Sequence, residues 1–106
     1  MSLAAAIRGS THRGQRILWQ TRDSPPRAVD LTGATITGVI QSVRTGQKRP
    51  IEGMLLAGVL VHEMEWIYDE ADVEEAGKFR VQFLAVFPDG TEERSYIESW
   101  EVLESL

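Results

Sequence analysis

The segment Lys78-Phe79-Arg80-Val81-Gln82-Phe83-Leu84-Ala85-Val86-Phe87 alternates large apolar side chains with other residues along its whole length. Successive side chains of a strand point to opposite faces, so the residues Phe79, Val81, Phe83, Ala85 and Phe87 would all face the same way. This alternation predicts a strand from Lys78 to Phe87 with one face in the core.

The residues that follow this segment predict a hairpin. Pro88-Asp89-Gly90 is typical of a tight turn, because glycine adopts a positive φ without steric cost. A final strand is expected from about residue 93 to residue 103, antiparallel to the first, with Tyr96, Trp100 and Val102 on one face.

On the N-terminal side, shorter segments with the same period are separated by turn-forming residues. The expected strands there are 15–21, with Ile17 and Trp19 on one face, 34–44, with Ile36 inward, a short one within 51–60, and 61–68, with Met64, Trp66 and Tyr68 on one face. The acidic segment 72–76 is expected to form a single helical turn that ends at Gly77. No segment shows a helical period of three turns, so the sequence predicts an all-β sandwich or small barrel.

The chain has 106 residues, which suits one domain spanning residues 1–106. Residues 1–12 lack a strand pattern and are expected to form a flexible N-terminal segment. The chain contains no cysteine, so neither a disulfide framework nor a thiolate metal site is expected. Its beginning lacks the basic start and long apolar run of a signal peptide, and no segment approaches the roughly 20 apolar residues of a membrane span, so neither a targeting signal nor a membrane partner is expected.

The net charge of −5 is divided unevenly along the chain. Residues 1–53 contain eight Lys and Arg against three Asp and Glu, whereas residues 54–106 contain three against thirteen. Such asymmetry can mark an assembly surface or a nucleic-acid-binding arm. A chain with a pI of about 5.0 is a poor candidate for nucleic acid, so no nucleic-acid partner is expected.

The order of these signals resembles the immunoglobulin-like N-terminal domain of phage baseplate upper proteins and related tail components. The resemblance extends from about Ile17 to Val102. The segments that carry it are Ile17-Leu18-Trp19, Asp30-Leu31-Thr32-Gly33-Ala34-Thr35-Ile36, the stretch from Trp66 to Asp72, Ala76-Gly77-Lys78-Phe79, the strand from Phe79 to Phe83, and the hairpin from Pro88 to Thr91. Where the family has Gly-Tyr, this chain has Gly77-Lys78-Phe79.

This resemblance implies an immunoglobulin-like antiparallel β-sandwich of about seven strands. It also implies a structural, non-enzymatic module without a cofactor, which docks to other phage tail or baseplate proteins or to further copies of itself. Its location would be the virion tail, or the host cytoplasm during assembly. The alternative is a carbohydrate- or surface-binding β-sandwich of a bacterial protein, which would use Trp19, Trp66 and Trp100 as stacking platforms.

The residue types of a hydrolase catalytic triad occur in the first third of the chain. Ser10, Thr11 and His12 adjoin one another, and Asp23 and Asp30 follow. A nucleophilic serine needs a special turn such as G-x-S-x-G, which the chain lacks. No catalytic residue is therefore expected.

Two groups of acidic residues are candidate metal ligands. His62 would face away from Glu63 and Glu65 in a strand, so these three cannot converge on one ion. Asp69, Glu70 and Asp72, with Glu74 and Glu75 nearby, form a denser acidic loop without the spacing of an EF-hand. A solvated loop is the favoured interpretation, and Asp69, Glu70 and Asp72 stay the weak candidate for a surface cation.

Five arginines lie near the start of the chain: Arg8, Arg13, Arg16, Arg22 and Arg27. No glycine-rich phosphate cradle or aromatic platform accompanies them. Docking to an acidic surface of a neighbouring subunit is the favoured interpretation.

Overall fold

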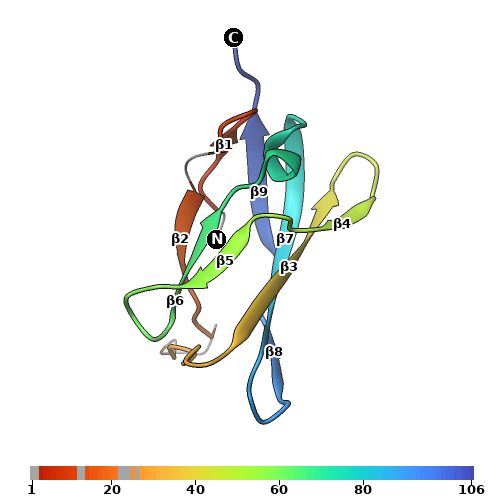
Figure 1. The fold of residues 1–106 in the computed structure, drawn as a ribbon. Coiled ribbons are helices and arrows are strands. Elements are labelled where there is room, and N and C mark those ends of the chain that lie inside the picture. The colour runs from red at the N-terminus through yellow and green to blue at the C-terminus, as the bar shows by residue number, and fades with distance from the viewer. Residues whose placement is uncertain (1–2, 12–13, 22–24, 26) are drawn as a thin grey trace.

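The computed structural model describes residues 3–11, 14–21, 25 and 27–106. These residues form two β-sheets and one short 3₁₀ helix, η1 (Glu70–Val73), and contain no α-helix (Figure 1). No helix among them is long and apolar enough to cross a membrane. The all-β prediction is therefore confirmed.

The larger sheet contains six strands in the order β1-β9-β7-β3-β4, with β8 also paired to β7. Its strands are β1 (Ala6–Ile7), β3 (Thr35–Ser42), β4 (Lys48–Pro50), β7 (Gly77–Val86), β8 (Glu92–Arg94) and β9 (Glu98–Leu103). All its pairings are antiparallel except that of β1 with β9, which is parallel.

The smaller sheet contains three antiparallel strands in the order β2-β6-β5. They are β2 (Gly14–Leu18), β5 (Met54–Ala57) and β6 (Glu63–Ile67). In Figure 1 this sheet lies in front of the strands β7 and β9, with β5 and β6 joined by a loop at the lower left. The described residues thus form nine strands rather than the expected seven. The short strands β1 and β4 do not correspond to any expected strand, and the expected last strand is divided into β8 and β9.

The core lies on the face of β7 that the sequence predicts. Phe79, Val81, Phe83 and Ala85 are all buried, and Phe87 packs against the same cluster. The other predicted core residues agree: Trp19 and Trp66 are buried, and Ile17 and Ile36 are partly buried against the cluster. Aromatic rings meet at its centre, where the Trp66 ring lies 6.0 Å from Phe83 and 4.7 Å from Trp100.

The predicted hairpin is present, but the final strand is not continuous as expected. Between the paired segments, Gln82 and Phe83 of β7 lie opposite three residues, Ser95 to Ile97. This one-residue excess is a β-bulge, and it divides the strand into β8 and β9. The prediction that Tyr96 shares the inner face of Trp100 and Val102 is therefore wrong, because the bulge turns Tyr96 outward, where it is 45% exposed.

The described part of residues 1–12, expected to be flexible, follows the edge of the larger sheet. The amides of Leu3 and Arg8 donate to carbonyl oxygens of β9, each at 2.8 Å, and the Gly9 amide donates to the Val73 oxygen at 2.9 Å. The Gln15 amide group also exchanges two 3.0 Å hydrogen bonds with the Ala4 backbone. The sequence missed this anchoring because only Ala6 and Ile7 form a strand.

Candidate functional site

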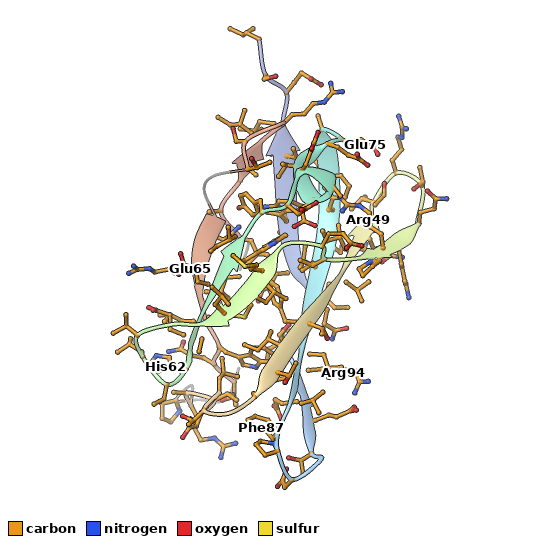
Figure 2. All side chains as sticks on the ribbon, in the orientation of Figure 1. Arg49, His62, Glu65, Glu75, Phe87 and Arg94 are labelled. Carbon is orange, nitrogen blue, oxygen red and sulfur yellow. The ribbon has the colours of Figure 1, made fainter. Side chains whose placement is uncertain are left out.

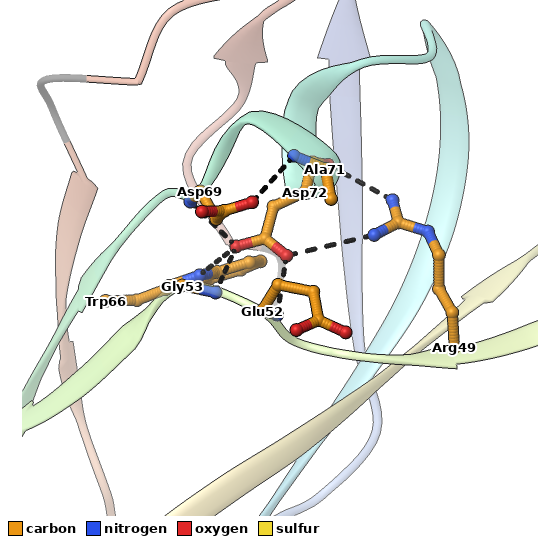
Figure 3. A network of polar contacts seen from close by, with 7 residues as sticks. All are labelled: Arg49, Glu52, Gly53, Trp66, Asp69, Ala71 and Asp72. Atoms are coloured by element: carbon orange, nitrogen blue, oxygen red, sulfur yellow. Dashed lines mark hydrogen bonds and ion pairs between the residues drawn. The ribbon is translucent and has the colours of Figure 1, made fainter.

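The acidic segment contains a fully buried carboxylate, that of Asp72 (Figure 3). Its Oδ1 accepts a hydrogen bond from the Glu52 amide at 2.9 Å. Its Oδ2 accepts from the Gly53 amide at 2.9 Å, the Asp69 amide at 3.1 Å and the Trp66 indole N–H at 3.2 Å. Four N–H groups from three parts of the chain therefore converge on one side chain.

Arg49 of β4 completes this network. Its Nη1 lies 3.8 Å from Asp72 Oδ1, and its Nη2 donates to the Asp72 carbonyl oxygen at 3.1 Å. The guanidinium also lies 5.8 Å from the centre of the Phe79 ring. The network around Asp72 and Arg49 thus joins β4, the β4–β5 connection, β6 and η1. Its role is to hold these elements together.

The expected helical turn is present but lies earlier in the chain than the predicted 72–76: it ends at Val73, and Gly77, expected to end it, is the first residue of β7. Asp69 caps η1, because its Oδ2 accepts from the Ala71 amide at 3.0 Å and it forms a capping box with Asp72. The sequence placed the start of the turn at Asp72, which instead lies inside it. The sequence alone does not locate the start of the turn, because this acidic run contains two aspartates, Asp69 and Asp72, that could each serve as the N-cap.

The weak cation candidate is not assembled in this arrangement. The Asp72 carboxylate is occupied by N–H donors, Asp69 accepts from a backbone amide, and Glu70 is exposed. Within the described ranges, no three His, Asp or Glu side chains are grouped as metal ligands. The structure therefore gives these carboxylates structural roles: Asp69 as a cap, and Asp72 as the centre of the network.

The second acidic group, His62, Glu63 and Glu65, is also dispersed. Glu63 is buried and its Oε1 accepts from the Val59 amide at 2.9 Å. Glu65 lies on the outer face of the smaller sheet, and Figure 2 shows it well above His62, which lies near the β5–β6 loop. Glu63 thus orders that loop.

The residues considered for catalysis are not brought together in the described structure. His12 and Asp23 lie outside the described residues. Ser10 forms a turn next to β1, where its amide donates to the Ile7 oxygen at 3.0 Å. The Asp30 carboxylate accepts from the Thr32 hydroxyl and amide, which lowers the pKa of Asp30.

Of the early arginines, Arg8 and Arg16 are placed by the structure on different sheets. Arg8 binds Glu104 at 2.7 Å and donates from Nε to the Glu74 oxygen, whereas Arg16 lies in β2 on the other sheet. Arg13 and Arg22 lie outside the described residues.

The tryptophans offer no stacking platform. Trp19, Trp66 and Trp100 are 5%, 0% and 2% exposed. A sugar stacks on an aromatic face only when that face is open to solvent, and these rings instead contact one another and their neighbours.

The structure shows an apolar surface that the sequence did not single out. The five residues Leu18, Leu56, Val59, Leu60 and Val61 are exposed at one end of the smaller sheet, and Val59 is 86% exposed. We call this surface the apolar tip. It comprises the β5–β6 loop, at the lower left in Figure 1, and the strand residues beside it.

The apolar tip is held in place by the backbone. The Gly58 amide donates to the Glu63 oxygen at 2.8 Å, and the Leu31 amide donates to the Val61 oxygen at 2.7 Å. Together with the buried Glu63 carboxylate, these bonds fix the loop while its apolar side chains stay in solvent. The sequence signal is the run Val59-Leu60-Val61 after Gly58, which falls at the boundary between the segment 51–60, expected to hold a short strand and a turn, and the expected strand 61–68.

A second surface lies on the outer face of the larger sheet. There a hollow of about 200 Å³ combines two cationic side chains with amides and apolar groups. We call it the basic hollow, and its lining residues are Val39, Gln41, Lys48, Arg80, Val81, Gln82 and Ile97.

No protein-family model matches the chain, and no curated protein shows significant sequence similarity to it.

Proposed function

We propose that this chain is a non-enzymatic interaction module, an immunoglobulin-like component of a phage or prophage tail or baseplate that docks to neighbouring tail proteins. The observation that carries the proposal is the apolar tip. Five large apolar side chains are exposed at this end of the smaller sheet, and three of them, Val59, Leu60 and Val61, lie on a loop that a buried carboxylate and backbone hydrogen bonds hold in place.

Exposed apolar side chains that cluster favour a docking role. Single exposed apolar residues are normal on a protein surface, but contiguous patches mark sites of interaction. The Glu63 carboxylate is buried beneath the loop to hold the Val59 amide, although burying a carboxylate is costly. A preorganised loop loses little conformational freedom on binding, so more of its contact energy contributes to affinity.

The resemblance to tail components supports the choice of partner. The segment from Asp30 to Ile36 forms the turn into β3, and the Pro88-to-Thr91 segment joins β7 to β8. These two segments thus lie in turns beside strands of the larger sheet, which is compatible with the resemblance. Tail proteins assemble in many copies around an axis, so weak contacts are multiplied.

The carbohydrate-binding alternative loses its main support. It depended on exposed tryptophans, and all three are buried. Among the described residues, Tyr96 is the one aromatic side chain that is exposed. No pair of exposed aromatic rings is therefore present there to take the place of the tryptophans.

Replacing the apolar tip should remove the chain from assembled tails. In the triple variant Val59→Ser/Leu60→Ser/Val61→Ser, the backbone hydrogen bonds of the loop remain, so its denaturation midpoint should stay close to that of the wild type. Its amount in purified particles should fall at least about tenfold, because a central apolar cluster contributes more than 1.4 kcal/mol to typical interfaces. Quantitative mass spectrometry of the particles measures this.

A matched control removes three exposed apolar side chains elsewhere. Val43→Ser/Leu103→Ser/Leu106→Ser changes residues that are also exposed but lie away from the β5–β6 loop. This control should be incorporated like the wild type. Incorporation of the tip variant at the wild-type level would refute docking through the apolar tip.

A further inference from the structure

Two surfaces of the larger sheet carry opposite charge. One is the basic hollow formed by β3, β4 and β7. The other consists of the turn after β7 together with strand β8, residues 87–94, and we call it the acidic hairpin. In Figure 2, Phe87 and Arg94 of the hairpin lie at the lower end of the molecule. The hollow is lined by residues 80–82 of β7, whereas β8 pairs with Leu84 to Val86, further along the same strand, so the two surfaces lie at different places on the sheet.

The basic hollow places two cations on either side of a neutral amide. Gln41 pairs with Lys48 on one side and with Arg80 on the other, so the three side chains form one row across three strands. Cross-strand neighbours lie about 5 Å apart at Cβ, so the Cβ atoms of Lys48 and Arg80 are about 10 Å apart. Neither cation forms an ion pair within the part of the chain that the structure describes.

The basic hollow carries a net positive charge although the chain as a whole is acidic. The chain carries 16 Asp and Glu against 11 Lys and Arg, yet no carboxylate lines the hollow. Apolar groups of Val39 and Ile97 lie beside the cations. A ligand for this hollow would therefore be anionic, and it would be large enough to cover Val39 and Ile97 as well as the cations.

The acidic hairpin has the complementary charge. Asp89, Glu92 and Glu93 are all exposed, and only Arg94, 3.5 Å from Glu92, offsets them. The Asp89 carboxylate accepts from the Thr91 hydroxyl at 2.7 Å, which lowers the pKa of Asp89. The Phe87 amide donates to the Thr91 oxygen at 2.9 Å and so closes the turn.

We propose that the acidic hairpin of one copy of this chain docks in the basic hollow of a second copy. Both surfaces belong to the same chain but lie at different places on it, so the contact is head-to-tail and repeats from copy to copy. The proposal rests on the proposed function in one respect: a tail component occurs in many copies, which brings such surfaces together. It uses the larger sheet and leaves the apolar tip free for a different tail protein.

The test reverses the charges of each surface in turn. Lys48→Glu/Arg80→Glu makes the hollow acidic, and Glu92→Lys/Glu93→Lys makes the hairpin basic. Sedimentation velocity at about 100 µM protein and low salt should show association of the wild type, and loss of it at about 1 M salt, where the Debye length is about 3 Å. Each variant alone should associate at least about tenfold more weakly, because both of its surfaces then carry the same sign.

An equimolar mixture of the two variants should restore association. The basic hairpin of one variant meets the acidic hollow of the other, and the unchanged surfaces of the two variants also fit each other. Glu70→Lys/Glu74→Lys is the matched control, because it makes the same change in net charge away from the hairpin and should associate like the wild type. Association of the single variants at the wild-type level, or a mixture that stays monomeric, would overturn the inference.

The two proposals fail in different ways. A wild-type chain that is monomeric under these conditions but present in purified tails overturns head-to-tail docking alone. A chain that associates through these surfaces but is absent from tails overturns the proposed function alone.

Discussion

Phe83→Ala is expected to lower the free energy of unfolding by about 3–5 kcal/mol, the range for removing a buried phenylalanine from a core. Phe83 is 1% exposed, and its ring lies 6.5 Å from that of Trp19 and 6.0 Å from that of Trp66. Its removal leaves a cavity between the two sheets that rigid indole rings cannot fill. Urea denaturation followed by tryptophan fluorescence measures the change.

Phe87→Ala is the matched control on the same face of the same segment. Phe87 is only partly buried against the core, so its removal should cost about 1–2 kcal/mol. An unchanged midpoint for Phe83→Ala, or equal costs for the two variants, would contradict the placement of Phe83 in the core.

Asp72→Ala should destabilise the chain by a similar amount, about 3–5 kcal/mol, as when one partner of a buried charged group is removed. The substitution leaves the amides of Glu52 and Gly53 and the Trp66 indole N–H without their acceptor, and takes the counter-charge from Arg49. Each buried donor left unsatisfied carries its own desolvation cost. Thermal or urea unfolding measures the loss.

Asp69→Ala is the control for the loss of a neighbouring carboxylate. Asp69 caps η1 from an exposed position, so its removal should cost only about 1 kcal/mol. If Asp72→Ala were as mild as Asp69→Ala, the buried network would not be a main support of the fold.

The strand at the centre of the fold could be predicted because its signal is local. Phe79, Val81, Phe83 and Ala85 alternate without interruption, and one buried face is enough to fix which side points inward. The turn at Gly90, which has a φ of 88°, could be predicted for the same reason.

The β-bulge and the Asp72 network could not be predicted in the same way. The bulge depends on how many residues of one strand lie opposite another, as when the Ser95 hydroxyl accepts from the Phe83 amide at 2.8 Å. The burial of Asp72 depends on amides at Glu52 and Gly53, about twenty positions away in the sequence. An acidic run by itself predicts a solvated loop, and nothing within the run marks Asp72 as the carboxylate that is buried.

The apolar tip marks a different limit. An apolar run such as Val59-Leu60-Val61 is expected to be buried, and only the three-dimensional arrangement shows that these side chains face solvent. The tip and the basic hollow lie on different sheets, so the two proposed docking surfaces differ both in position and in chemistry.

The most direct test of the proposed function is mass spectrometry of phage particles induced from the organism that encodes the chain. The chain should co-purify with assembled tails, at a stoichiometry in multiples of three or six because tails are symmetric. Tails that assemble without it, with the chain left free in the soluble fraction, would contradict the assignment as a tail component.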